Sequence, residues 1–204
     1  HQEETGPMRT VYAILYCIIF PFFNLVHPCR AVGREHIPEG GVLVCANHTA
    51  ASDPFFLVFA FRLKHQVRAM AKAELIRVPV IGWLLSKAGV FGVDRGKADV
   101  GAIKQAMKFL KGGEKVLLFP EGTRIKDGGA GEAKTGAAML AVRCGVPILP
   151  VYVPEKKRWF GRTPVVIGEP YLPHVESRKG TQEEYEAITA DLMARIRALE
   201  VQTI

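Results

Sequence analysis

The sequence predicts an α/β fold: a mixed, largely parallel sheet flanked by helices, with an N-terminal apolar helical segment that associates with a membrane. Short apolar runs of strand length alternate with helical patterns along the chain, which favours parallel strands joined by helices. An uncharged stretch precedes this alternation at residues 11–26. The chain of 204 residues is 49% hydrophobic and 23% charged, which suffices for one core and excludes disorder, collagen-like repeats and coiled coils.

The expected elements follow in order. Strands are expected at residues 42–46, 67–71, 90–93, 116–119, 148–153 and 165–167. Helices are expected at residues 55–63, 80–88, 100–111, 135–143 and 182–199. Asp53 and Pro54 are typical of a helix start, with Asp53 as the cap and Pro54 at the first helical position. Gly112 and Gly113 are expected to end the third helix.

The chain divides into three parts. Residues 1–7 have the character of an expression-tag remnant before Met8, residues 8–30 form the apolar segment, and residues 31–204 form one domain. The uncharged run of residues 11–26 is shorter than the roughly 20 residues that a spanning helix needs. We therefore expect it to lie in one leaflet of a membrane. Its aromatic residues recur at helical spacing and would form a stripe on one face of a helix: Tyr12, Tyr16, Phe20 and Phe23. The alternative to membrane contact is that this helix packs on the rest of the domain.

The chain is basic, with 27 Lys and Arg against 20 Asp and Glu, a formal net charge of +7. Much of the excess lies between Arg62 and Lys115, where basic residues outnumber acidic ones. Such a chain suits an anionic membrane, a phosphorylated substrate or nucleic acid. No nucleic-acid recognition motif is present, so nucleic acid is not an expected partner.

The four cysteines have no paired spacing, which argues against a zinc site, and no other metal site is expected. Cys17 lies in the apolar run and Cys45 in a strand-like run, so both are expected to be buried, reduced thiols. This favours a reducing compartment. No glycine-rich nucleotide loop and no serine nucleophile elbow occur, which argues against nucleotide hydrolysis and against a covalent acyl-enzyme.

Polar residues follow three strand-like runs, and the carboxyl ends of such strands meet at one edge of an α/β sheet. His48 and Asp53 follow the first run. A neutral imidazole can remove a proton from a hydroxyl, and a carboxylate on its other nitrogen fixes its tautomer. The two side chains can meet only if residues 49–52 form a turn. The alternative is that Asp53 merely caps a helix.

Two arginines follow the other runs. The guanidinium groups of Arg95 and Arg124 match phosphate oxygens, and Lys72 could add a positive charge. Glu121 is expected to position Arg124 rather than to transfer a proton.

These residues resemble the glycerolipid acyltransferases, the family of the lysophosphatidic acid acyltransferases. The resemblance extends from about Ala31 to Val153 and has every block in order. Residues 47–53 (NHTAASD) match the NHxxxxD motif, and residues 119–124 (FPEGTR) match a second motif. Weaker blocks are KAEL at residues 72–75, GVFGVDR at residues 89–95 and VPILPV at residues 146–151. Gly92 departs from the family, which often has a bulkier residue there.

The resemblance implies a 1-acylglycerol-3-phosphate O-acyltransferase that moves an acyl group from acyl-CoA or acyl carrier protein to lysophosphatidic acid, giving phosphatidic acid. It implies that His48 is the general base and Asp53 its partner. No cofactor beyond the acyl donor is expected. An anionic membrane lipid is the further partner, and the enzyme is expected at the cytoplasmic face of a membrane. The implied substrate-binding residues are Asn47, Lys72, Arg95, Glu121, Gly122, Thr123 and Arg124.

Alternatives remain open at this point. The acceptor could be another lysophospholipid or glycerol-3-phosphate. His48 could instead activate water in a thioesterase-like hydrolase. A third class is a lipid-binding module without catalysis.

Overall fold

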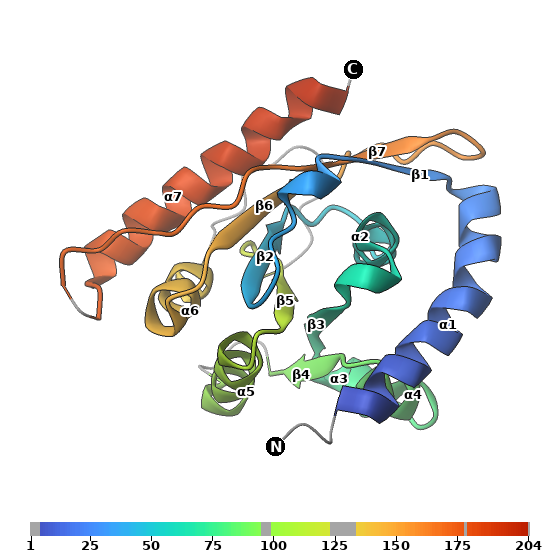
Figure 1. Ribbon diagram of the computed structural model, residues 1–204, viewed down its shortest axis with the longest axis horizontal. Coiled ribbons are helices and arrows are strands. Elements are labelled where there is room, and N and C mark those ends of the chain that lie inside the picture. The colour runs from blue at the N-terminus through green and yellow to red at the C-terminus, as the bar shows by residue number, and fades with distance from the viewer. Residues whose placement is uncertain (1–4, 95–98, 123–133, 178, 204) are drawn as a thin grey trace.

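The computed structural model describes residues 5–94, 99–122, 134–177 and 179–203 of the chain (Figure 1). Its strands form one seven-stranded sheet in the order β1-β7-β6-β2-β5-β3-β4. Neighbouring strands run parallel except at the β6–β7 pair, which is antiparallel. The strands are β1 Cys29–Val32, β2 Val42–Ala46, β3 Val67–Lys72, β4 Phe91–Val93, β5 Lys115–Leu118, β6 Ile148–Tyr152 and β7 Thr163–Ile167.

Helices cover both faces of this sheet. The α-helices are α1 Thr5–Val26, α2 Asp53–Phe61, α3 Ala73–Ile76, α4 Ile81–Lys87, α5 Val100–Lys111, α6 Gly136–Cys144 and α7 Gln182–Ala198. Short 3-10 turns lie at Arg34–His36, Leu63–His65 and Leu199–Thr203. Figure 1 shows α5, α6 and α7 on one face and α2 on the other, with α1 outside α2. The predicted α/β fold with a mixed, largely parallel sheet is therefore confirmed.

The central strand β2 explains how the two layers of helices are held. All five of its residues are buried, as is typical of a parallel strand covered on both faces. Successive side chains point to opposite faces of a strand. Leu43 and Cys45 accordingly belong to the core beneath α5, α6 and α7, whereas Val44 and Ala46 belong to the core beneath α2.

Several expected boundaries differ from the structure. Strand β1 was not expected, because its four residues follow the apolar segment directly and their exposure does not alternate. The short helix α3 was also not expected. The helix expected at residues 55–63 begins earlier, at Asp53, and ends at Phe61. The N-cap of this helix is Ser52 and not Asp53, because the Asp53 carboxylate binds backbone amides that precede the helix.

The apolar N-terminal segment is helical, and α1 has two different apolar faces. Its aromatic face packs on α2: the rings of Tyr16, Phe20 and Phe23 lie with their centroids 5.0–5.3 Å from that of Phe59. The predicted aromatic stripe thus contacts the domain, as in the alternative considered above. A second face remains exposed and consists of Ile14, Ile18, Phe22 and Leu25.

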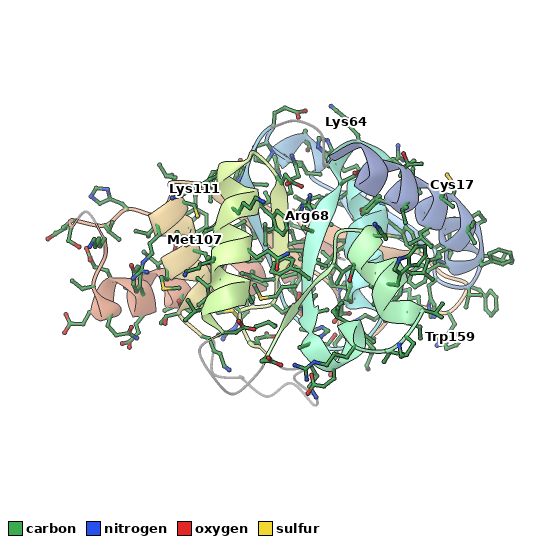
Figure 2. All side chains as sticks on the ribbon, turned by 90° about the horizontal axis from the view of Figure 1, so that it is seen from below. Cys17, Lys64, Arg68, Met107, Lys111 and Trp159 are labelled. Atoms are coloured by element: carbon green, nitrogen blue, oxygen red, sulfur yellow. The ribbon has the colours of Figure 1, made fainter. Side chains whose placement is uncertain are left out.

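No helix within the described residues is both long enough and apolar enough to cross a membrane. Contact of α1 with a membrane stays a prediction, and it now concerns the exposed face. The expectation that Cys17 is buried is wrong, because its side chain points away from the body of the molecule (Figure 2). Cys45 is fully buried, as expected.

Two glycines have the same backbone conformation but different surroundings. Comparing substitutions at these two positions therefore tests how closely the end of β1 packs against β7. Gly33 and Gly40 both have φ +82°, which L side chains rarely adopt. A Cβ on Gly33 would lie 2.1 Å from the carbonyl oxygen of Ile167, whereas a Cβ on Gly40 would meet nothing within 4 Å.

We expect Gly40→Ala to lower the free energy of unfolding by about 1–2 kcal/mol, the cost of the left-handed conformation alone. Gly33→Ala adds a steric clash, which costs about 1–3 kcal/mol more. Urea denaturation of the two variants measures the difference. Equal losses would contradict the close packing of Gly33 against β7.

Candidate active site

The carboxyl ends of β2, β5 and β6 meet at one edge of the sheet, and His48 lies there two residues after β2. Asn47 holds the start of this loop: its Nδ2 donates to the Val153 carbonyl and its Oδ1 accepts from the Val153 amide, each at 2.8 Å. The side-chain amide of Asn47 therefore extends the pairing of β2 with β6 beyond the end of β2. Its expected role in substrate binding stays a prediction.

Asp53 binds both the imidazole and the backbone of the loop that carries it. Its Oδ2 accepts from His48 Nδ1 at 3.0 Å, from the Thr49 amide at 2.7 Å and from the Ala50 amide at 2.8 Å. Residues 49–52 therefore form the turn that the spacing required. Asp53 does not cap α2 because its carboxylate binds amides that precede the helix.

Lys157 completes the surroundings of Asp53. Its ammonium lies 2.6 Å from Asp53 Oδ1 and donates to Thr49 Oγ1 at 2.7 Å. The Asp53 side chain is fully buried and the Lys157 side chain is 8% exposed, so the pair is shielded from water. The sequence offered little signal for this contact, because Lys157 stands among charged neighbours that are typical of a solvated loop.

These contacts keep Asp53 ionised. Burial alone would raise the pKa of its carboxyl, but hydrogen bonds from His48, Ala50 and Lys157 outweigh burial and hold the pKa below its usual value. An ionised carboxylate can only accept hydrogen bonds. His48 Nδ1 must therefore donate, which leaves Nε2 of the neutral ring as a proton acceptor.

Glu121 also supports His48, through its backbone. The buried Glu121 Oε2 accepts from the His48 amide at 2.8 Å. Burial raises the pKa of Glu121 above its usual value, although the His48 amide opposes this shift. The expectation that Glu121 positions Arg124 lies outside the described residues, since Arg124 is not among them.

The other expected substrate-binding residues are less completely described. Arg95, Thr123 and Arg124 lie outside the described residues. Lys72 is exposed, and its ammonium lies 3.0 Å from Glu74. Gly122, with φ +67°, ends the described part of the β5 loop, and the side chain of Lys134 lies beside it. Lys134 is a basic residue that the sequence analysis did not single out for this site.

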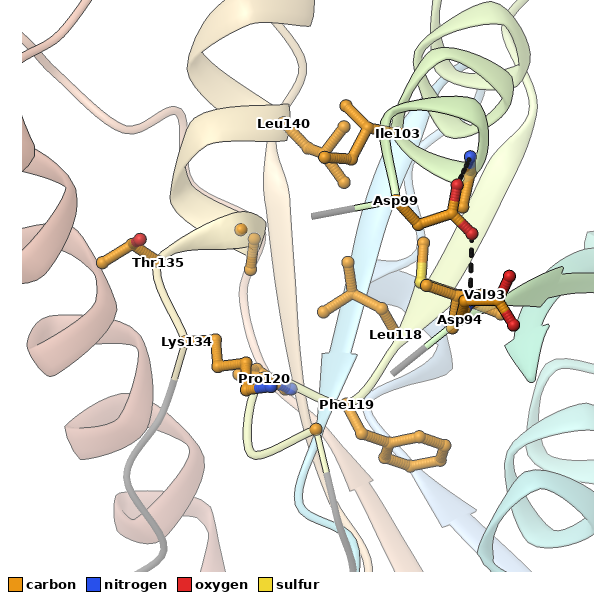
Figure 3. Close-up of a pocket in the computed structure, with 15 residues that line it drawn as sticks. Val93, Asp94, Asp99, Ile103, Leu118, Phe119, Pro120, Lys134, Thr135 and Leu140 are labelled. Carbon is orange, nitrogen blue, oxygen red and sulfur yellow. Dashed lines mark hydrogen bonds between the residues drawn. The ribbon is translucent and has the colours of Figure 1, made fainter. Parts of the chain in front are cut away.

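Two cavities lie on either side of Phe119, whose ring stacks on the His48 ring with centroids 4.0 Å apart. One cavity, of about 310 Å³, lies between β5, α5 and α6 and includes Gly122 and Lys134 (Figure 3). Asp99 lies at its rim, where its carboxylate accepts from the amides of Asp94 and Ala102.

The other cavity, of about 230 Å³, is almost wholly apolar. It lies between α1, α2, β3 and α4, and it reaches Ala51 in the turn after His48 and Pro54 in the first turn of α2. Within the described part of the chain, no group of three or more His, Cys, Asp and Glu residues could hold a metal ion. The site therefore combines a buried imidazole and carboxylate with two cavities. One is almost wholly apolar, and the other has a mainly apolar lining that also contains Asp94, Asp99 and Lys134.

The ion pair between Lys157 and Asp53 can be tested by replacing Lys157 with methionine. At neutral pH we expect Lys157→Met to lower the free energy of unfolding by about 3–5 kcal/mol, since it leaves a buried carboxylate without its cation. Lys156→Met is the control, because Lys156 is exposed; its effect should stay within about 0.5 kcal/mol.

The difference between wild type and Lys157→Met should also depend on pH. A carboxyl whose folded pKa is depressed stabilises the fold above its unfolded pKa, and it loses this effect as the pH falls through the folded pKa. Without Lys157, the pKa of Asp53 rises. The two proteins should therefore differ most at neutral pH and less as the pH falls below about 5. Urea denaturation between pH 7 and about pH 4 measures the free energy of unfolding of both proteins. A difference that does not change with pH would contradict the ion pair between Lys157 and Asp53.

The chain is similar to known acyltransferases. The acyltransferase family model matches residues 29–154. A 1-acyl-sn-glycerol-3-phosphate acyltransferase of Pseudomonas aeruginosa is 34% identical over 183 residues, which cover 82% of this chain and 70% of that protein. A chloroplastic enzyme of the same kind from Brassica napus is 33% identical over 137 residues, 65% of this chain, and the match spans only 38% of that protein.

A solved structure is similar over nearly the whole chain. The 1-acyl-sn-glycerophosphate acyltransferase PlsC of Thermotoga maritima matches with a TM-score of 0.65 and 26% identity, covering 96% of this chain and 78% of that one. The match includes the same α/β sheet with its covering helices. Together with the family model, these similarities show that the chain belongs to the acyltransferase family.

Proposed function

We propose that the chain transfers a fatty acyl group from an acyl thioester to the free hydroxyl of 1-acyl-glycerol-3-phosphate, giving phosphatidic acid. The observation that carries this proposal is the buried contact of His48 Nδ1 with the ionised Asp53, beside an apolar cavity. The names of the relatives support the acceptor, since the similar proteins are acyltransferases of 1-acyl-sn-glycerol-3-phosphate. The donor is acyl-CoA or acyl carrier protein.

His48 acts as the general base in this proposal. Its Nε2 removes the proton of the acceptor hydroxyl while the hydroxyl oxygen attacks the thioester carbonyl carbon. The carbon–sulfur bond then breaks, and the imidazolium returns the proton to the departing thiolate. Asp53 stabilises the imidazolium, and Lys157 keeps Asp53 ionised. No covalent acyl-enzyme forms.

The apolar cavity is the proposed site of an acyl chain. It extends from Phe119 and Ala51, beside the imidazole, to the flank of α1 at Leu15 and Ile19. A chain laid in this cavity would have its carbonyl end near His48. The apolar lining suits a hydrocarbon, because it offers few groups whose hydrogen bonds with water would be lost.

The phosphate of the acceptor is proposed to bind at the end of the β5 loop, where Gly122 and the basic Lys134 line the cavity of about 310 Å³. The other described residues that the resemblance assigns to substrate binding are Asn47, Lys72 and Glu121. Arg95, Thr123 and Arg124 belong to the same proposal. Guanidinium and ammonium groups are the usual partners of phosphate oxygens in proteins.

A further part of the proposal is that the enzyme docks on the cytoplasmic face of a membrane through α1. The exposed face of α1 carries Phe22, 73% exposed, and Leu25, 70% exposed. Exposed apolar surface of this kind is typical of membrane or protein contacts. A lipid acceptor and an acyl chain could then enter the apolar cavity from the flank of the same helix.

Replacing the base tests the proposed chemistry. We expect His48→Ala to lower phosphatidic acid formation by about 10²–10⁴-fold, the usual contribution of a general base. His174→Ala is the control, because His174 is exposed. The assay compares phosphatidic acid formation with release of free fatty acid, with and without lysophosphatidic acid. Release of free fatty acid at the same rate with and without lysophosphatidic acid would instead indicate a hydrolase. Retained turnover in His48→Ala would refute the role of His48 as the general base.

Replacing exposed residues of α1 tests the docking. We expect the double variant Ile18→Ser and Phe22→Ser to sediment less with phospholipid vesicles, since each apolar side chain contributes about 1.5–3 kcal/mol when it leaves water. Leu172→Ser with Val201→Ser is the matched control, because these residues are similarly exposed but do not belong to α1. Equal sedimentation of the two double variants would contradict docking through α1.

A further inference from the structure

A polar hollow of about 380 Å³ lies on the flank of α1 opposite to the apolar cavity. Its α1 lining is Phe20, at the edge of the aromatic face that packs on α2, and Asn24, one turn further along the helix. The rest of its lining comes from β1 and the residue before it, the turn after β1, the residue after α2 and the residue before β7. The hollow shares no lining residue with the two cavities beside His48. Its charged lining residues are Arg30, Arg34, Arg62 and Arg162.

These four arginines gather positive charge that the described part of the chain leaves unbalanced. None of them forms an ion pair with a described carboxylate, and no described acidic residue lines the hollow. Burial lowers the pKa of Arg34, and the positive charge of Arg62 lowers it further. Like charges held together in this way are stabilised when an anion binds between them.

The local structure holds the side chain of one of these arginines and strains the backbone of another. Arg34 Nε donates to the Ala60 carbonyl at 2.7 Å, which holds its guanidinium against the last turn of α2. Arg62 follows that turn with φ +60° and ψ 178°, a backbone conformation that is nearly confined to glycine. Such strain costs about 1–3 kcal/mol and is concentrated at ligand sites and other functional positions.

The hollow adjoins the surface that the proposed docking would place in a bilayer. Phe22 and Leu25 are exposed on the next face of α1. Exposed Trp159 and Phe160 lie against the end of α1: the Phe160 amide donates to the Val26 carbonyl, and the Trp159 ring lies 4.7 Å from the His27 ring. Apolar side chains and arginines thus occupy neighbouring parts of one surface, as at the boundary between acyl chains and headgroups.

We propose that this hollow binds the phosphate of an anionic phospholipid of the bilayer, at a second lipid site separate from the catalytic one. Guanidinium groups bind phosphate oxygens through paired hydrogen bonds. A lipid bound there fixes how the molecule is oriented about the axis of α1. In this orientation the apolar cavity, on the opposite flank of α1, faces the membrane. The inference rests on the proposed docking of α1 into a bilayer.

The test compares two triple variants of the full chain that lose the same charge. Arg30→Gln, Arg62→Gln and Arg162→Gln remove three arginines of the hollow and leave Arg34, which bonds to α2. Lys104→Gln, Lys108→Gln and Lys111→Gln remove three exposed lysines of α5. Figure 2 shows Lys111 on the opposite side of the molecule from Cys17 of α1. Binding to phosphatidylcholine vesicles with and without phosphatidylglycerol is measured by sedimentation at constant salt.

We expect the arginine variant to bind phosphatidylglycerol vesicles roughly 100-fold more weakly than wild type, from the usual contribution of three basic side chains at an anionic surface. The lysine variant should stay within about threefold of wild type. Equal losses in the two variants would overturn the site, because net charge alone would then explain binding. Unchanged binding of the arginine variant would also overturn the proposed lipid site. So would equal binding of the wild type to vesicles with and without phosphatidylglycerol.

The proposed function is measured separately. Wild-type turnover of lysophosphatidic acid in detergent micelles reports the chemistry without a bilayer. Absence of that turnover, together with selective loss of vesicle binding by the arginine variant, would refute the proposed reaction while supporting the lipid site. Normal turnover with equal vesicle binding by all three proteins would support the reaction and refute the lipid site.

Discussion

The buried carboxylate of Asp53 is the group on which the rest of the site depends. A fully buried anion is costly unless charges and hydrogen bonds surround it. Here two amides of its own loop, the His48 ring and the Lys157 ammonium meet that requirement. The same contacts shape the loop after β2, orient the imidazole and join this loop to the segment that follows β6. Stability and chemistry therefore share one set of interactions.

The sequence predicted much of this arrangement because its signals were local. Residues 42–46 form β2 as expected, and residues 100–111 form α5 as expected, since an apolar strand and an amphipathic helix show in their own residues. His48 and Asp53 meet as their motif and a turn required. Lys157 was not predicted, because it reaches Asp53 across a separation of more than 100 residues. The antiparallel β6–β7 pair likewise depends on long-range contacts.

Helix α1 shows why periodicity alone could not assign its faces. Both faces are apolar, so the pattern did not distinguish the side that packs on Phe59 from the side with Phe22 that remains exposed. In the structure, one flank of α1 lines the apolar cavity and the other lines the arginine hollow. The proposed docking brings acyl chains and anionic headgroups to one surface, and the two flanks of this helix adjoin regions suited to each.

The role of Asp53 is tested most directly by the tautomer of His48. It is measured by ¹⁵N NMR of the neutral imidazole, with His48→Ala used to assign the signals. An ionised Asp53 can only accept from Nδ1, so we expect a neutral ring with its proton on Nδ1 and an unprotonated Nε2. A ring that carries its proton on Nε2 would contradict the proposed role of His48 as the general base, because no lone pair would then remain there to receive the proton of the acceptor hydroxyl.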